Sequence, residues 1–496
     1  MILQEFMLVQ KLKSITETGS KTENLLYKKL IVLFFIFLFL SIFFSGMRAD
    51  ITADEVEFYY RFNMADLFEG KLSIFLEIFQ KTDHFPFYFI IHGFVFHLFK
   101  SVYMLRILSL FYVMVSIFYI RNIFILKQKS ENFLIVYLIF FLFTPAFLFS
   151  VIFSSKYNFA LMFLIISYYQ ILKVNEKIYL KQSFKTVFFL IICFAAHYLT
   201  APFIFIFISK IKNKALKIFS FALFLILVIL VLFNFRLIFQ NIDMNTGESK
   251  TTVLSTTVEN SFTKLTDVIK MTGGAVINPG IYREYRVYNK YNLYAGFIIF
   301  ILIIIPSKNV KYDSLIYVFS YITGFFILTF VTERLWNIRV LEPDRLLFIF
   351  PFANYRITQL FFEKKYYSRI ILIVLMFFYS TGIYFIFHDS SFDLQNIEKI
   401  LSVKNNVKIF SRADLFSQEF DEISMLSLYY NNFEKISEPI SEKEFYVFSN
   451  RDLDYIKNKS DKDFLKIILK KYGVEEIYSG KNYYLHRVFN SNSQFN

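Results

Sequence analysis

Long apolar runs separated by short basic segments make up the first three quarters of the chain. An apolar run of roughly 17 or more residues can cross a bilayer as a helix, because a helix bonds all its backbone polar groups internally. The pattern therefore predicts a polytopic α-helical membrane protein with about 11 transmembrane helices. We expect these spans near residues 30–46, 104–124, 132–152 (interrupted by Pro145), 157–172, 186–208 (two short helices), 216–239, 292–306, 312–333, 345–361 and 368–387.

The lysines between the apolar runs set the predicted orientation, because cytoplasmic loops carry an excess of Lys and Arg. Residues 1–29 are then a cytoplasmic segment, and residues 47–103 form the first outer loop. A single span over 186–208 would place the lysines of 210–217 outside. Two short helices that turn near His197 keep them inside, and broken helices are tolerated where they line a cavity. The polar segment 240–290 then becomes a second large outer loop.

The first outer loop contains a short amphipathic helix, predicted over about residues 86–99 with Pro86 in its first turn. His84, Tyr88 and His92 recur every four residues and share one stripe of this segment. The helix is too short to span the bilayer, so we expect it along the outer membrane surface as a juxtamembrane helix. On that interpretation His92 and His97 belong to its polar face.

The last hundred residues change character, so the chain divides into a transmembrane domain (30–388) and a small C-terminal α/β domain (389–496) outside the membrane. Charged residues return there, and short strand-like runs alternate with helical ones. The expected strands are Val407–Phe410, Glu444–Phe448, Glu475–Tyr478 and Tyr483–Val488, and the expected helices are Phe420–Leu428 and Asp461–Lys471.

The composition favours membrane lipid over nucleic acid as a binding partner. The 496 residues are 56% hydrophobic and carry a formal net charge of +14. Because the lysines cluster in short loops between spans, membrane lipid explains this charge and nucleic acid does not. The single Cys193 excludes an intramolecular disulfide, and no Cys/His spacing indicates a zinc site.

Carboxylates are scarce in the apolar part of the chain, yet five of them fall between Asp50 and Asp66. In a membrane enzyme such a group can act as a general base. The alternative is that these residues only solvate a loop beside the membrane.

Six elements then follow one another in a recognisable order. They are Asp54-Glu55, His84 with Pro86, Arg106, Pro145 with Lys156-Tyr157, His197-Tyr198, and Arg345 before Pro351. This order resembles the type C (GT-C) membrane glycosyltransferases, the family that includes protein O-mannosyltransferases and aminoarabinose transferases of lipid A. The resemblance covers about residues 30–360. The chain departs from the family pattern in three places: the usual Pro-Pro after His84 is broken, Lys156 replaces an arginine, and Arg345 lacks an adjacent tyrosine.

The resemblance implies transfer of a sugar from a polyprenyl-phosphate donor to a glycan, lipid or protein acceptor outside the inner (plasma) membrane. Asp54 is then the expected base, with Glu55 second. The resemblance does not decide whether a divalent cation, Mg or Mn, is bound; Asp54 and His84 would hold it. The expected substrate-binding residues are His84, Arg106, Lys156, Tyr157, His197, Tyr198 and Arg345.

Each of these residues also has a structural reading. His84 can simply begin a helix, Lys156 can snorkel at a helix end, Arg345 can pair with Glu342 or Asp344, and His197 can be a hydrogen-bonded core residue.

Two other functions stay open. An oligosaccharide polymerase or ligase also uses lipid-linked substrates and would use Arg283 and Arg286 of loop 240–290. A transporter or lipid flippase should show paired repeats or mid-membrane charges, and neither is evident.

Overall fold

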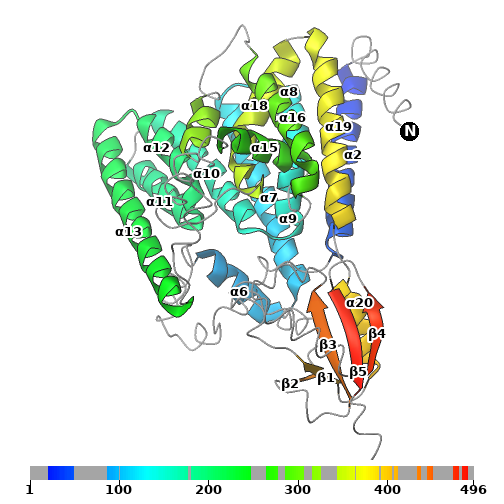
Figure 1. Ribbon diagram of the computed structural model, residues 1–496. Coiled ribbons are helices and arrows are strands. Elements are labelled where there is room, and N and C mark those ends of the chain that lie inside the picture. The colour runs from blue at the N-terminus through cyan, green and yellow to red at the C-terminus, as the bar shows by residue number, and fades with distance from the viewer. Residues whose placement is uncertain are drawn as a thin grey trace, which may run out of the picture.

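A helical bundle and a small α/β domain make up the protein, as seen in a computed structural model (Figure 1). The structure describes residues 21–49, 87–99, 101–176, 180–246, 264–277, 285–305, 316–324, 343–363, 365–389, 393–404, 407–410, 433–436, 444–450, 473–479 and 483–489.

The bundle confirms the predicted polytopic helical architecture. Within the described ranges, five helices are long and apolar enough to cross a membrane, or six if one bent pair counts as a span. The helices are α2 (Lys21–Gly46), α6 (Phe87–Phe99), α7 (Val102–Leu126), α8 (Glu131–Leu142), α9 (Pro145–Ile152), α10 (Lys156–Glu176), α11 (Leu180–Ala196), α12 (Ala201–Ser209), α13 (Lys214–Thr246), α15 (Lys264–Ile277), α16 (Tyr285–Ile304), α18 (Phe350–Glu363) and α19 (Lys365–Asp389), with 3-10 turns η1 (Tyr198–Thr200) and η3 (Pro343–Ile349).

Both predicted helix breaks are present. The bent pair α8 and α9 turns by 65° at Pro145, which takes the first position of α9, where its missing N–H costs no helical hydrogen bond. Between α11 and α12, η1 separates two short helices, and Pro202 lies in the first turn of the second. The two-helix interpretation of residues 186–208 is therefore confirmed.

The segment 240–290 differs from the polar loop that we expected. It contains α15, which packs tightly on α16, and α16 itself begins at Tyr285. A Cβ at Gly273 would lie 1.7 Å from the carbonyl O of Asn292, and one at Gly296 would lie 1.9 Å from that of Ile269. The two backbones thus touch through glycines, as small residues permit in membrane helix pairs. Gly273 therefore lies in a helix, at the point where α15 touches α16.

The short helix α6 lies where a juxtamembrane helix was predicted, but its faces are reversed. Tyr88 and His92 are buried, with exposed fractions of 2% and 0%. The outward face carries Phe94 and Leu98, about half exposed. The assignment of His92 to a polar surface is therefore wrong, whereas His97 is exposed. The reason is that apolar side chains face lipid around a bundle, so polar ones turn inward.

The C-terminal domain contains helix α20 (Asp393–Ser402) and one five-stranded sheet. The sheet order is β2 (Phe433–Ile436), β1 (Val407–Phe410), β3 (Glu444–Asn450), β5 (Tyr483–Phe489) and β4 (Gly473–Ser479). Strand β1 pairs in parallel with β2 and β3, and β5 pairs antiparallel with β3 and β4. The four predicted strands are present. Strand β2 and helix α20 were not predicted, and the expected helices at 420–428 and 461–471 lie outside the described residues.

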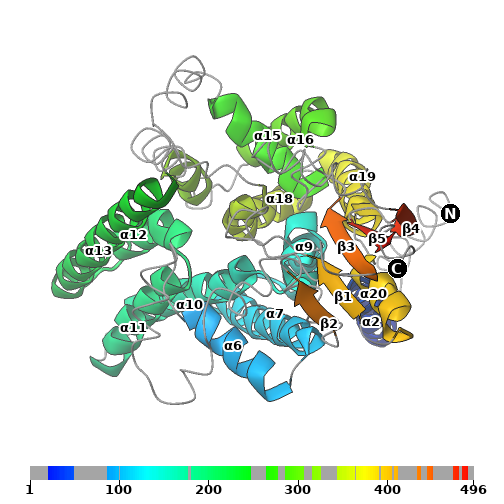
Figure 2. The ribbon, with the colours of Figure 1, turned by 60° about the horizontal axis from the view of Figure 1, so that its bottom comes forward.

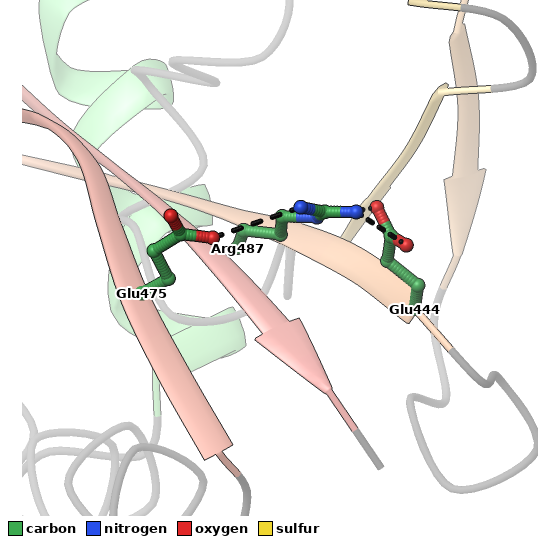
Figure 3. A network of polar contacts seen from close by, with 3 residues as sticks. All are labelled: Glu444, Glu475 and Arg487. Atoms are coloured by element: carbon green, nitrogen blue, oxygen red, sulfur yellow. Dashed lines mark hydrogen bonds and ion pairs between the residues drawn. The ribbon is translucent and has the colours of Figure 1, made fainter.

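An ion-pair network crosses the antiparallel part of this sheet (Figure 3). Arg487 on β5 donates from Nε and Nη2 to the two carboxylate oxygens of Glu444 on β3, at 2.6 and 2.9 Å. Its Nη1 lies 3.6 Å from Glu475 on β4. The hydrogen bonds from Arg487 lower the pKa of Glu444.

The domain docks where α2 ends and α7 begins, and we call this the domain end of the bundle (Figure 1). Gln395 of α20 donates to the carbonyl O of Arg48, just after α2, at 2.6 Å. Helix α7 has 25 residues and so runs about 37 Å to the opposite end. We call that opposite end, where Lys127 follows α7, the lysine end.

Candidate functional site

Three segments far apart in sequence meet inside the bundle, at the start of α10. The ring of Tyr157 lies 4.9 Å from that of His197, and both lie about 6 Å from Phe348 of η3, at 6.2 and 6.0 Å. The ring of Tyr198 lies 4.8 Å from His197. We call Tyr157, His197, Tyr198 and Phe348 the aromatic junction. Tyr157, His197 and Tyr198 are among the substrate-binding residues that the family resemblance implied.

The histidine of the junction is fixed by its own turn. His197 is 1% exposed, and its Nδ1 accepts the backbone N–H of Leu199 at 3.1 Å. Thr200 Oγ1 donates to the carbonyl oxygens of Cys193 and His197, at 3.1 and 2.9 Å. Because Nδ1 is an acceptor, a neutral His197 carries its proton on Nε2 and can donate from there.

Lys156 begins α10 beside the junction and is half-buried. The preceding Ser155 accepts the backbone N–H of Tyr157 at 3.2 Å and so caps the helix. Before it, Ser154 has a positive φ of 45°, a conformation unusual for a residue other than glycine. This turn holds Lys156 at a helix N-terminus, where the helix dipole also favours an anion.

Helix α6 is tied to the same turn, which brings part of the first loop to the domain end (Figure 2). Tyr88 Oη donates to the carbonyl O of Ser154 at 2.7 Å, and Ser154 Oγ donates to the carbonyl O of Leu105 at 2.9 Å. The Tyr88 ring packs on His92 at 3.9 Å, and His92 Nε2 lies 3.3 Å from Tyr112 Oη. Burial lowers the pKa of His92 to about 3, so this histidine is neutral at physiological pH.

Arg106 is 1% exposed and holds the end of α2. Its Nη1 donates to the carbonyl oxygens of Met47 and Ala49, at 2.7 and 2.9 Å, and its guanidinium lies 5.3 Å from the Phe153 ring centre. Both carbonyls belong to the turn that directly follows α2, and Arg106 supplies them with donors. The residue thus fixes the backbone at Met47 and Ala49, which in sequence directly precede the acidic segment starting at Asp50.

Sequence reasoning missed a polar pair next to the junction. Asn158 is fully buried, and its Nδ2 donates to Ser109 Oγ at 2.7 Å and to the Ser109 carbonyl at 3.1 Å. The amide joins α10 to α7. An asparagine within an apolar span was the signal available in the sequence, since such residues face a bundle interior.

Asp54, Glu55 and His84 lie outside the described residues, and the side chain of Arg345 is likewise not described, although its backbone belongs to η3. The structure therefore brings together Lys156, Tyr157, His197 and Tyr198, places Arg106 at the end of α2, and leaves the carboxylates as predictions. In the described part of the chain, no three His, Cys, Asp or Glu side chains are grouped to hold a metal ion.

No protein-family model matches the sequence, and no curated protein matches it. Among solved structures, the chain is similar to ArnT from Cupriavidus metallidurans bound to undecaprenyl phosphate. The identity is 9% over 92% of this chain and 97% of that chain, with a TM-score of 0.46. For ArnT from the same organism in the apo state, the identity is 10% over 94% and 99% of the two chains, with a TM-score of 0.48.

Proposed function

We propose that the protein is an integral membrane glycosyltransferase that moves a sugar from a polyprenyl-phosphate donor to an acceptor on the extracytoplasmic side of the membrane. The acceptor class is a cell-envelope glycan, a lipid or a protein. Asp54 of the first loop is the proposed base, and the chemistry takes place at the domain end of the bundle.

The observation that supports this proposal most is the aromatic junction. Tyr157, His197 and Phe348 come from segments that are 40 and about 150 residues apart, yet their rings meet within about 6 Å. These are three of the segments whose order resembles the GT-C family. The residues of a substrate site must lie around one reacting group. The close approach of these three segments meets that requirement.

The proposed reaction exchanges one bond for another. The acceptor oxygen or nitrogen forms a bond to the anomeric carbon of the sugar, while the bond from that carbon to the phosphate oxygen breaks. The acceptor proton passes to the carboxylate of Asp54, and polyprenyl phosphate leaves with the bonding electron pair.

Charge develops on the leaving phosphate, so donors and cations are needed beside it. We assign this task to Lys156 at the start of α10, to Arg345 of η3 and to the Nε2–H of His197. Tyr157 and Tyr198 pack against the His197 ring and hold it in place. Arg106 acts indirectly, as a positioning residue that fixes the start of the acidic loop.

The experiment that tests this proposal measures sugar transfer in proteoliposomes from labelled undecaprenyl-phosphate sugars, undecaprenyl phosphate being the lipid bound in one ArnT structure. Asp54→Asn is compared with Asp66→Asn, a matched loss of one carboxylate in the same loop. We expect transfer by Asp54→Asn to fall by about 100-fold or more, as for loss of a general base. Asp66→Asn should retain transfer.

Lys156→Gln tests the phosphate site separately. Loss of a cation that binds the donor should raise the KM for the donor. Retained transfer in Asp54→Asn would contradict the assignment of the base. No transfer by the wild type from any monosaccharide donor, together with transfer from lipid-linked oligosaccharides, would replace the proposal with the ligase function.

A further inference from the structure

A cavity opens at the lysine end, remote from the aromatic junction. It has a volume of about 700 Å³ and lies among α7, α10, α18 and residues 316–324. Helices α7 and α10 both run to it from the domain end, where Arg106 and Lys156 lie near their first turns. The cavity therefore belongs to the opposite membrane face, and the proposed transfer reaction does not use it.

Four lysines line the mouth of this cavity, namely Lys127, Lys129, Lys210 and Lys212. Lys127 Nζ lies 4.9 Å from the ring centre of Tyr355 and 5.0 Å from that of Tyr168. Lys129 Nζ lies 5.1 Å from Phe133 and 5.6 Å from Tyr355. These cation–π contacts hold the ammonium groups of Lys127 and Lys129 over the aromatic rings at the cavity.

The charge at this mouth has one sign. None of the described lining residues is acidic. Burial and the neighbouring Lys127 lower the pKa of Lys129, and Glu363, which does not line the cavity, raises it. Cations that repel one another in a partly buried place are stabilised by a bound anion.

The lysines at the mouth are positioned by a built turn. Asn175 at the end of α10 donates from Nδ2 to the carbonyl O of Lys210 at 2.9 Å, and its Oδ1 accepts the backbone N–H of Lys212 at 3.1 Å. One asparagine therefore fixes the backbone of both lysines relative to α10.

Deeper in the cavity, Gln359 of α18 lacks a partner for its acceptor. The residue is 6% exposed, and its Oε1 makes no hydrogen bond with the described residues. A buried acceptor without a donor is costly, so a ligand hydroxyl is the complement that this atom needs. The remaining walls are apolar and include Ile123, Leu164 and Ile165.

We propose that this cavity binds an anionic phospholipid with a hydroxylated headgroup. Its phosphate lies among Lys127, Lys129, Lys210 and Lys212, and a headgroup hydroxyl donates to Gln359. The apolar walls distinguish a lipid from a soluble phosphate ester, which has no chain to place against them. Basic pockets between membrane helices on the side rich in lysine are suited to such headgroups.

The test uses delipidated protein and measures lipid affinity by native mass spectrometry, with phosphatidylglycerol, phosphatidic acid and phosphatidylcholine as probes. The double variant Lys127→Gln/Lys129→Gln is compared with Lys181→Gln/Lys185→Gln. The control removes the same charge from exposed positions of α11, predicted to lie on the same side. We expect the first double variant to lose about tenfold or more in phosphatidylglycerol affinity and the control to change less than twofold.

Gln359→Leu tests the hydroxyl contact. It should weaken phosphatidylglycerol binding and leave phosphatidic acid binding unchanged, because phosphatidic acid lacks the headgroup hydroxyls.

Equal loss of phosphatidylglycerol affinity in the two double variants, or equal affinity of the wild type for phosphatidylcholine, would overturn the proposal. Glycerol phosphate that competes as well as the intact lipid would replace the lipid with a soluble phosphate ester. The readout is binding, so these outcomes are independent of whether sugar transfer is found.

Discussion

Arg106 offers the sharpest test of how the domain end is held together. The guanidinium is buried, and its Nη1 donates to the carbonyl oxygens of Met47 and Ala49 at 2.7 and 2.9 Å. In Arg106→Met the side chain keeps an apolar stem of similar length but has no donor. The carbonyl oxygens of Met47 and Ala49, directly after α2, then lose this donor in a buried place.

The magnitude follows from these two bonds. Each buried carbonyl without a donor costs about 1–3 kcal/mol, so the two together cost about 2–6 kcal/mol. Loss of the contact with the Phe153 ring adds about 0.5–1 kcal/mol. Removing a buried cation offsets part of this loss. We therefore expect Arg106→Met to lower the free energy of unfolding by about 3 kcal/mol.

The assay is denaturant unfolding in mixed micelles, with Arg121→Met as the matched control. Arg121 lies on the same helix but is exposed, so its loss should change stability by less than about 0.5 kcal/mol. Equal stability of the two variants would refute the structural role of Arg106. If Arg106→Met instead kept its stability and lost donor affinity, Arg106 would be a phosphate ligand.

Three further predictions use the same unfolding assay. Gly273→Ala should destabilise the protein by at least about 1–3 kcal/mol, because its new methyl group would overlap the backbone of α16, and unchanged stability would contradict the close packing. Because burial lowers the pKa of His92 to about 3 from 6.5, the unfolded state takes up its proton first, and stability should fall as the pH drops from about 6.5 toward 3. Between pH 6.5 and 5 the loss is about 1.6 kcal/mol, and His92→Gln should lack this part of the slope. Glu444→Gln should lower the free energy of unfolding more than Glu475→Gln, because Arg487 bonds Glu444 through two donors. The loss should stay under about 1 kcal/mol, because both ion pairs are partly exposed. Equal losses in the two variants would mean that this geometry is not maintained in solution.

Several features of the molecule followed from the sequence alone. The apolar runs predicted the spans, because a bilayer admits only segments that satisfy their own backbone. Pro145 and the turn near His197 predicted two helix breaks, since local backbone chemistry is sufficient for them. The family order named Lys156, Tyr157, His197 and Tyr198, and the structure brings their segments together.

Other features were decided by the tertiary structure. The polar segment 240–290 is typical of a loop in sequence, but a helix there packs on α16 through Gly273, a contact that no local pattern records. The inward face of α6 was mistaken for the outward one, because lipid and protein core are both apolar and periodicity cannot tell them apart. The cavity at the lysine end depends on Lys127 and Lys210, which are 83 positions apart, and on Gln359 from a third helix. Hydrophobic pattern determines which segments enter the membrane, whereas the pairing of helices determines which polar groups meet.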